Sequence, residues 1–226
     1  MPHKCYAHSL KDSPQELWHD LLKHLEDTAV RAEAFASRFA PGWGRLAGLW
    51  HDTGKYQEAF QRHIGVDPNG HCDERVDHSS VGARIAYQCA AQPLAFLIAG
   101  HHGGLRDQEK VRRRVEKAES LLFEARRNGL PKSIEAEPTP LPPGWIGTDR
   151  AKLAFWIRFL FSALVDADFL DTERFYRGAE RDLGSTVSLA ALRDRLDGFI
   201  DRLAGQKERS PVNEMRARVL GDCRPP

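Results

Sequence analysis

Apolar residues in this chain recur every three to four positions in most segments, and no convincing run of alternating β-branched residues appears. Because this spacing places apolar side chains on one face of a helix, the pattern predicts an all-α fold. The first helix is expected to begin at Ser13-Pro14 and to end near Ala40, before Pro41-Gly42. Further helices are predicted at residues 43–51, 57–63, 78–91, 93–101, 109–128, 153–170 and 189–203.

The segment 153–170 is apolar on nearly every face of a helix, so it is expected to be the central buried helix. It contains Arg158, Asp166 and Asp168, and these charges argue against a membrane span. The segment 129–148 holds five of the 13 prolines and is expected to be a loop that crosses the surface.

The chain has 226 residues, of which 41% are hydrophobic and 29% are charged, and its formal net charge is +1. Length and composition predict one globular domain, residues 1–205, followed by a polar tail, residues 206–226. A charge so close to zero gives no global basic field, so any nucleic-acid binding has to come from a local patch. We find no secretory signal and no C-x-x-C pair among the four cysteines, and therefore expect a reduced, cytoplasmic protein.

The dipeptide His51-Asp52, in LAGLWHDTGK, is the strongest local signal. Adjacent residues of a helix point about 100° apart, so the two side chains can straddle a pair of metal ions. Lys55 is placed next to such a site. The alternative is that His51 and Asp52 only cap the end of a helix.

A second signal is the pair His101-His102, in LAFLIAGHHGGL, which follows an apolar helix and precedes two glycines. Imidazoles next to an apolar core need polar partners, and a metal ion would provide one. Solvated histidines at a helix end are the alternative.

Periodicity places His24 on the apolar stripe of the first helix, facing inward, and His19 on its polar face, where it would be solvated. An inward histidine can equally be a hydrogen-bonded core residue. His78 follows a polar loop, where Asp77 or Ser79 could cap the next helix.

Asp166 and Asp168 are acids in an otherwise apolar helix, and buried acids are seldom unpaired. A cation would pair them, and so would an arginine such as Arg158. Periodicity does not choose between the two acids. Imidazoles and carboxylates without thiolates suit Mn, Fe, Co, Ni or Zn, and the set is large enough for two ions about 3.5–4 Å apart.

Further motifs are AHS at residues 7–9, GLWHDTGKYQEAFQ, DHS at 77–79, AGHHGGL at 99–105 and SALVDADFLDTE at 162–173. Together with the order of histidines and acids, they resemble the HD phosphohydrolase superfamily and, within it, the HD nuclease domain of the type I CRISPR-associated nuclease–helicase. The resemblance runs from about Ala7 to the tail. It implies an all-α HD-domain helical bundle with a metal site in its core.

The resemblance also implies roles for residues. His51, Asp52 and Lys55 would be catalytic, with Asp52 bridging one or two divalent transition-metal ions and Lys55 holding or neutralising a phosphate. The family motif has an aromatic residue after Ala-Asp, which favours Asp168 over Asp166. The implied metal ligands are His24, His51, Asp52, His78, His101, His102 and Asp168.

The implied function is hydrolysis of single-stranded DNA after recruitment to a guide-RNA surveillance complex. A superfamily 2 helicase would act in cis or in trans, because this chain has no Walker A motif. The segment SPVNEMRARVLGDC resembles the stretch that leads into the helicase in fused members.

A basic run follows the histidine pair, with Arg106, Arg112, Arg113 and Arg114 as candidate DNA-binding residues. Such side chains would hold a phosphate backbone without reading sequence. The alternative is a solvated helix face paired with Glu109 and its neighbouring acids.

Two other functions compete with the nuclease interpretation. One is an HD-type nucleotide phosphohydrolase acting on small phosphorylated substrates. The other is a non-catalytic docking module that keeps the HD fold.

Overall fold

The computed structural model describes residues 4–66, 76–180, 187–205 and 210–223. Helices account for 68% of the structure, which confirms the predicted all-α fold class. Contacts divide the chain into two compact units, Met1–Arg181 and Asp182–Pro226. The domain end expected at residue 205 stays a prediction, because compactness alone does not mark where a functional domain ends.

A short antiparallel pair of strands, β1 (Tyr6–His8) and β2 (His19–Asp20), precedes the first α-helix, and η1 (Gln15–Leu17) lies between them along the chain. No strand was expected here, because two or three residues are too few to show an alternating pattern. The side chain of His19, in β2, is buried and only 6% exposed. The expectation of a solvated His19 on a helix surface was therefore wrong.

Helix α1 (Leu21–Ala36) begins later than the periodicity indicates. Its N-terminal cap is Asp20, whose side chain accepts a hydrogen bond from the backbone N–H of Lys23 at 3.0 Å. Pro14 has an extended backbone conformation, with ψ at 151°, so it does not open the helix. The expected helix limits at residues 13 and 40 were therefore wrong, although His24 does face inward.

Helix α2 (Trp43–Trp50) packs tightly against α1, because small residues meet at the contact. A Cβ atom on Gly44 would lie 2.4 Å from the carbonyl oxygen of Ala32, and one on Gly48 would lie 2.4 Å from Cα of Ala29. No side chain fits there, so both positions need glycine. The contact sets the C-terminal end of α2 beside α1.

Two more glycines bring α4 (Ser79–Gln88) against the end of α2. A Cβ atom on Gly54, in η2 (Thr53–Tyr56), would lie 2.0 Å from the carbonyl oxygen of His78. One on Gly82 would lie 1.8 Å from a backbone carbonyl oxygen of α2. The backbone at His78 therefore crosses directly over the residues that follow α2.

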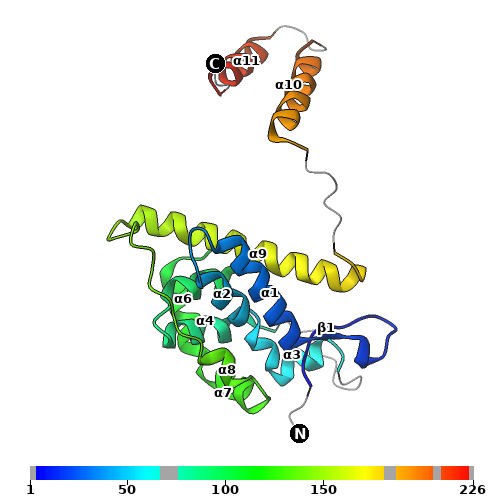
Figure 1. The fold of residues 1–226 in the computed structure, drawn as a ribbon, viewed down its shortest axis with the longest axis vertical. Helices are drawn as coiled ribbons and strands as arrows, with labels where there is room; N and C mark the ends of the chain where they lie inside the picture. Colours follow the sequence, from blue (N-terminus) through cyan, green and yellow to red (C-terminus); the bar gives the residue numbers. More distant parts are fainter. Residues whose placement is uncertain (1–3, 67–75, 181–186, 206–209, 224–226) are drawn as a thin grey trace. The chain divides into compact units, whose positions relative to one another are not determined.

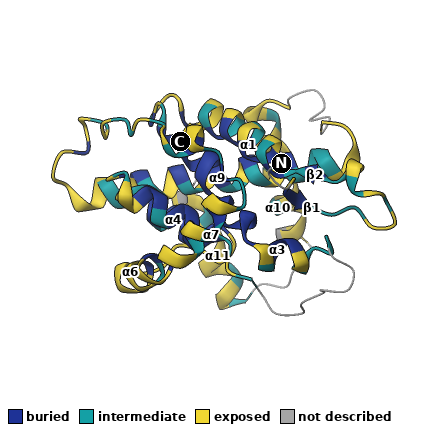
Figure 2. Ribbon diagram, turned by 90° about the horizontal axis from the view of Figure 1, so that it is seen from below, coloured by how far each residue is buried: buried dark blue, intermediate teal, exposed yellow. Residues whose placement is uncertain are grey.

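Five shorter helices complete this part of the first unit: α3 (Glu58–His63), α5 (Gln92–Gly100), α6 (Gln108–Lys117), α7 (Glu119–Arg127) and α8 (Lys132–Glu135). The single helix expected over 109–128 is broken at Ala118, because α6 packs on α4 and α5 whereas α7 packs on α4 and η2. Helix α8 lies inside the loop expected over 129–148. Figure 2 shows that α6 is exposed over most of its surface, and its buried residues are Val111 and Val115.

Figure 1 shows the long helix α9 (Arg150–Arg177) running along the first unit beside α1. One of its faces packs on α1, α2 and α5, with Trp156 and Leu160 fully buried. On another face Phe155 is 57% exposed and Phe159 is 49% exposed. The expectation of a central helix buried on nearly every face was therefore wrong, because α9 covers the core from one side.

The second unit contains α10 (Leu189–Gly205) and α11 (Pro211–Cys223). The first of these confirms the helix predicted at 189–203, whereas α11 forms within the segment expected to be a polar tail. Residues 206–209 and 224–226 of that tail lie outside the described residues. None of the helices in the described ranges combines the length and the apolar character that crossing a lipid bilayer requires.

Candidate metal centre

Three helices bring four polar side chains together in the interior of the first unit. His24 of α1, His51 and Asp52 after α2, and Asp168 of α9 offer ligand atoms that all lie within 4.8 Å of one another. We call these four residues the inner group. The Nε2 atom of His24 lies 3.4 Å from Oδ2 of Asp52 and 3.4 Å from Oδ1 of Asp168. The Nε2 atom of His51 lies 3.4 Å and 3.6 Å from the same two oxygens.

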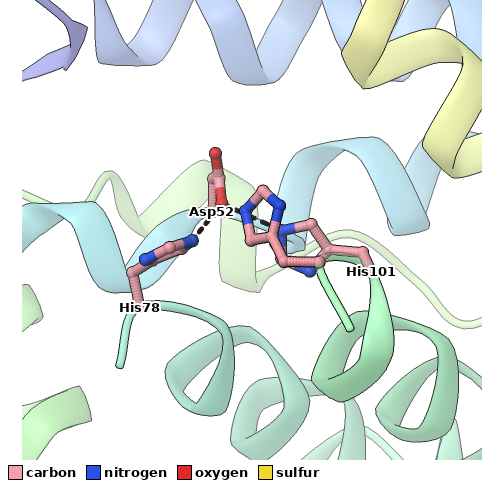
Figure 3. A group of neighbouring side chains, drawn as sticks. Asp52, His78 and His101 are labelled. Atoms are coloured by element: carbon pink, nitrogen blue, oxygen red, sulfur yellow. Dashed lines mark hydrogen bonds and ion pairs between the residues drawn. The ribbon is translucent and has the colours of Figure 1, made fainter. Parts of the chain in front are cut away.

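A second set of ligand atoms meets the same aspartate from the other side. This outer group consists of Asp52, His78, His101 and His102, again with all ligand atoms within 4.8 Å. His78 precedes α4, and the histidine pair follows α5. The Nε2 atoms of His78 and His101 lie 3.6 Å and 3.3 Å from Oδ1 of Asp52, and Figure 3 shows both rings pointing toward this carboxylate.

Asp52 therefore belongs to both groups, with Oδ2 facing the inner histidines and Oδ1 facing the outer ones. The spacing suits metal ligands, because four atoms around an ion at about 2.1 Å lie about 3.4 Å from one another. Each oxygen of Asp52 could therefore join one of the two groups in holding a metal ion.

Several of these atoms are buried without a hydrogen-bond partner. In the described ranges, such atoms include Nε2 of His24, His51 and His78. An unsatisfied buried polar atom is unfavourable by about 1–3 kcal/mol. Cations bound by these nitrogens would satisfy all three of them, and imidazole with carboxylate is a common ligand set for divalent transition metals. The residues present thus fit the metal centre that the sequence predicts.

The opposite nitrogen of each ring is held by a hydrogen bond. The Nδ1 atoms of His51 and His101 lie 2.7 Å from the carbonyl oxygens of Gly48 and Ile98, respectively. That of His78 lies 3.2 Å from a backbone carbonyl oxygen in its own segment. A carbonyl only accepts, so Nδ1–H is the donor and the Nε2 lone pair is left to bind an ion.

The electrostatics of Asp52, His78 and His102 also favour cation binding. Burial opposes ionisation of Asp52, but Lys55 and His51 hold the pKa of its carboxyl well below the usual range. Burial lowers the pKa of His78 to about 4 and that of His102 to about 4. At neutral pH the carboxylate is negative and these two imidazoles are neutral, which are the states that bind metal.

Lys55, expected to meet a phosphate, is 3% exposed. Its Nζ atom lies 2.6 Å from Oδ2 of Asp52 and donates a hydrogen bond to the carbonyl oxygen of Ala7 at 3.2 Å. The lysine thus neutralises part of the charge on Asp52 from within the protein.

The two acids that periodicity left open lie on different faces of α9. Asp168 belongs to the inner group, and its side chain is 15% exposed. Asp166 is exposed and belongs to neither group. The difference arises because a separation of two residues on a helix turns the side chain by about 200°.

The arginines predicted to bind DNA have different surroundings. Arg112 and Arg113 are exposed, and both donate to the carboxylate of Glu109, with N–O distances of 3.2 Å and 2.8 Å. These two side chains thus have the partner that the alternative of a solvated helix face requires.

Arg114 binds other parts of the protein. It lies 2.7 Å from Oδ1 of Asp77, donates to the hydroxyls of Ser79 and Ser80 at 2.8 Å and 3.0 Å, and also donates to the carbonyl oxygen of Ala99. Arg114 thus ties the segment next to His78 to the end of α5.

Arg106 lines a cavity of about 390 Å³ beside the outer group, together with His78, His102 and Arg114. Its guanidinium lies next to the backbone of Gly103, where a Cβ atom would be 3.2 Å from Nη2. Within the part of the chain that the structure describes, no carboxylate is paired with Arg106, whereas Glu109 pairs with Arg112 and Asp77 with Arg114.

The sequence pattern assigned no site role to three residues next to the inner group. Asp171 is 0% exposed and lies 2.8 Å from Nδ1 of His24. His8 and His19 form a further cluster with His24, and the Nε2 atom of His8 lies 3.2 Å from the hydroxyl of Thr172. A second acid one helical turn after Asp168 was a visible signal for Asp171, whereas nothing local indicated His19.

The family model described as "Cas3, HD domain" matches residues 7–157 of the chain. The match includes Asp52 and every histidine of both groups, and it ends before Asp168. A comparison with curated proteins found no match.

Proposed function

Since this chain belongs to the Cas3 HD-domain family of HD nucleases, we propose that it is a metal-dependent nuclease that degrades single-stranded DNA in type I CRISPR interference. The observation that supports this proposal most is the shared carboxylate of Asp52 between two groups of histidines. A pair of sites with one common ligand is the arrangement that suits hydrolysis of a phosphodiester.

The inner group would hold one divalent ion and the outer group a second. Bound ions would supply Lewis-acid stabilisation of the phosphate charge and lower the pKa of water. The protein itself supplies fixed imidazole orientations and a buried, negatively charged Asp52, with Lys55 offsetting part of that charge.

The scissile strand would approach through the cavity beside the outer group. Its lining includes His78 and His102, which are candidate ligands, and Arg106, whose guanidinium can contact a phosphate oxygen. A contact of this kind recognises the backbone and carries no sequence information. Arg112 and Arg113 would lie farther along the strand, and their role in DNA binding stays a prediction.

We further propose that a superfamily 2 helicase, in cis or in trans, delivers the single strand and that a guide-RNA surveillance complex recruits both. Family membership supports an association with a helicase and a CRISPR complex in general.

The matched pair Asp168→Asn and Asp166→Asn tests the proposal. Both acids lie on α9, and only Asp168 belongs to the inner group. With Mn²⁺, Co²⁺, Ni²⁺ or Zn²⁺ added in turn, we expect the unmodified chain to cleave circular single-stranded DNA. Asp168→Asn should cleave at least about 100-fold more slowly, since even the loss of a residue that only supports a ligand weakens a metal site about 10–100-fold. Asp166→Asn should cleave like the unmodified chain.

The same assay, with free nucleotides offered beside the circular DNA, separates the competing functions. Release of phosphate from free nucleotides only, with circular DNA intact, would favour a nucleotide phosphohydrolase. Intact DNA and intact nucleotides with every ion would favour a docking module. Equal cleavage by the two variants would contradict the proposed ligand set.

A further inference from the structure

His24 lies between two carboxylate environments, because each of its ring nitrogens faces acids. Its Nε2 atom lies 3.4 Å from Asp52 and from Asp168, within the inner group. Its Nδ1 atom lies 2.8 Å from Oδ2 of Asp171, at the distance of a charge-assisted hydrogen bond. Asp171 is fully buried and comes one helical turn after Asp168 on α9.

This support differs from that of the other candidate ligands. His51, His78 and His101 each donate from Nδ1 to a backbone carbonyl oxygen. A backbone carbonyl is neutral and cannot be removed by substitution. Asp171 is charged and belongs to a side chain, so it orients the ring of His24 and also makes its other nitrogen a better electron donor.

Asp171 has two further neighbours. Its Oδ1 atom accepts a hydrogen bond from Nη2 of Arg174 at 2.7 Å, and its Oδ2 atom, which faces His24, also lies 3.4 Å from Nε2 of His19. Arg174 also donates to Asp27 of α1, which pairs with Lys23 at 2.9 Å. The chain of contacts joins α1 and α9 on the side of His24 that faces away from the inner group.

We propose that Asp171 is a positioning residue for the inner ion, because it accepts the Nδ1–H of His24 and thereby aims Nε2 at Asp52 and Asp168. This inference rests on the proposed metal function. Asp171 touches no ion itself. It sets the tautomer and the orientation of one imidazole, and so it sets the affinity of the inner group while leaving that of the outer group unchanged.

A different arrangement would place a third ion among His8, His19 and His24. That ion would need a nitrogen of His24, and both nitrogens already face carboxylates. If Asp171 positions His24, the chain binds two ions, whereas a site among His8, His19 and His24 would add a third. The number of bound ions therefore distinguishes the two arrangements.

The test is a Mn²⁺ titration of the metal-free full chain by calorimetry, with Asp171→Ala, Asp171→Asn and Asp166→Asn. We expect two ions per unmodified chain. In Asp171→Ala one of the two affinities should fall by about 10–100-fold and the other should stay. In Asp171→Asn this affinity should fall less, because the amide oxygen can still accept the hydrogen bond from His24. Asp166→Asn, on the same helix, should bind like the unmodified chain.

Nitrogen-15 NMR of the histidine rings gives a readout that a loss of packing alone would not move. In the metal-free chain, the Nδ1–H proton of His24 should give a low-field signal that exchanges slowly with water, because the carboxylate of Asp171 holds it. This signal should be lost in Asp171→Ala and kept in Asp166→Asn. Circular dichroism shows whether each variant is folded. If Asp171→Ala does not fold, Asp171→Leu, which keeps the volume of the side chain and removes the acceptor, takes its place in both measurements.

The outcomes separate this inference from the proposed function. An unmodified chain that binds no divalent ion would remove both. An unmodified chain with two ions, together with an Asp171→Ala variant whose two affinities and His24 Nδ1–H signal are unchanged, would remove the positioning role alone. A third ion that disappears in Asp171→Ala would replace this role with direct ligation.

Discussion

Asp52 has two oxygens with different neighbours, and this division gives the residue an effect on both groups at once. Oδ2 faces His24 and His51, while Oδ1 faces His78 and His101. An asparagine at this position keeps the shape but presents an N–H donor where one group needs an acceptor.

We therefore predict that Asp52→Asn loses both ions. Mass spectrometry of metals in the purified chain should show less than about one tenth of the unmodified content, since a shared ligand is worth at least as much as a supporting residue. Asp166→Asn is the control and should keep its metal. A variant that retained a full pair of ions would show that Asp52 does not bridge.

Asp52 and Lys55 also form a buried ion pair, with Nζ 2.6 Å from Oδ2. Removing one partner of such a pair is unfavourable by about 3–5 kcal/mol, because the other charge is left buried. In metal-free protein we expect Asp52→Asn to lower the free energy of unfolding by this amount. Adding Lys55→Met should recover much of the loss, as measured by urea denaturation. A double variant no more stable than the single one would argue against the pair.

Local motifs predicted much of the site at this scale. The dipeptide His51-Asp52 and the pair His101-His102 could be found because each stands at the end of an apolar helix. Asp171 could not be assigned a role, because its partner His24 is 147 positions away in the sequence. His19 was misplaced because a two-residue strand leaves no periodic pattern.

Glycine positions set how closely the helices that carry the site approach one another. Gly48 lets α2 lie directly on α1, since a Cβ atom would come within 2.4 Å of Ala29. Any side chain there would push the end of α2, with its two candidate ligands, away from His24.

We predict that Gly48→Ala lowers the free energy of unfolding by at least about 2 kcal/mol, within the range for overpacked cores. Its inner group should also bind metal more weakly. Gly198→Ala, in α10, meets only Arg202 at 3.6 Å, so it should leave the first unit unchanged. Tryptophan fluorescence in urea measures both variants. A Gly48→Ala chain as stable as the original would contradict the close contact.

Arg114 connects α6 with the segments that carry the outer group, through Asp77, Ser79 and Ala99. We predict that Arg114→Ala weakens binding of the outer ion and lowers the free energy of unfolding by about 1–3 kcal/mol, as expected for buried partners left unsatisfied.

Arg113→Ala is the matched control for that variant, because Arg113 is exposed and pairs with Glu109. Its unfolding free energy and metal affinity should stay within about 0.5 kcal/mol of the original. Equal effects of the two substitutions would show that the contacts of Arg114 with Asp77, Ser79 and Ala99 do not stabilise the outer group.

The order of most helices could be predicted at the scale of elements, because apolar residues recur at helical spacing. The packing partners and the exposed faces of these helices could not be predicted. The break at Ala118 depends on α6 and α7 packing against different neighbours, and the open face of α9 at Phe155 depends on how many helices cover it. Such facts belong to tertiary structure, which periodicity does not encode.

In the molecule as a whole, every residue of both groups lies in the first unit. Ions that bind only the folded state stabilise it by about 2.7 kcal/mol when their concentration is 100 times Kd. For a unit of this size, we predict that saturating Mn²⁺ raises Tm by about 5–10 °C. A chelator should reverse the rise, and Asp52→Asn should show almost none. A Tm that does not respond to any divalent ion would contradict the metal centre.

Helix α9 provides Asp168 to the inner group and, one turn later, Asp171 to the back of His24. The rotation of this one helix about its axis therefore sets the positions of both carboxylates. Inserting one residue in α9 before Asp168 would rotate both acids about the helix axis by about 100°. A shift of α9 along its axis would move both carboxylates away from His24 together. A displacement of α9 therefore changes the inner group at two points, because it moves both Asp168 and Asp171.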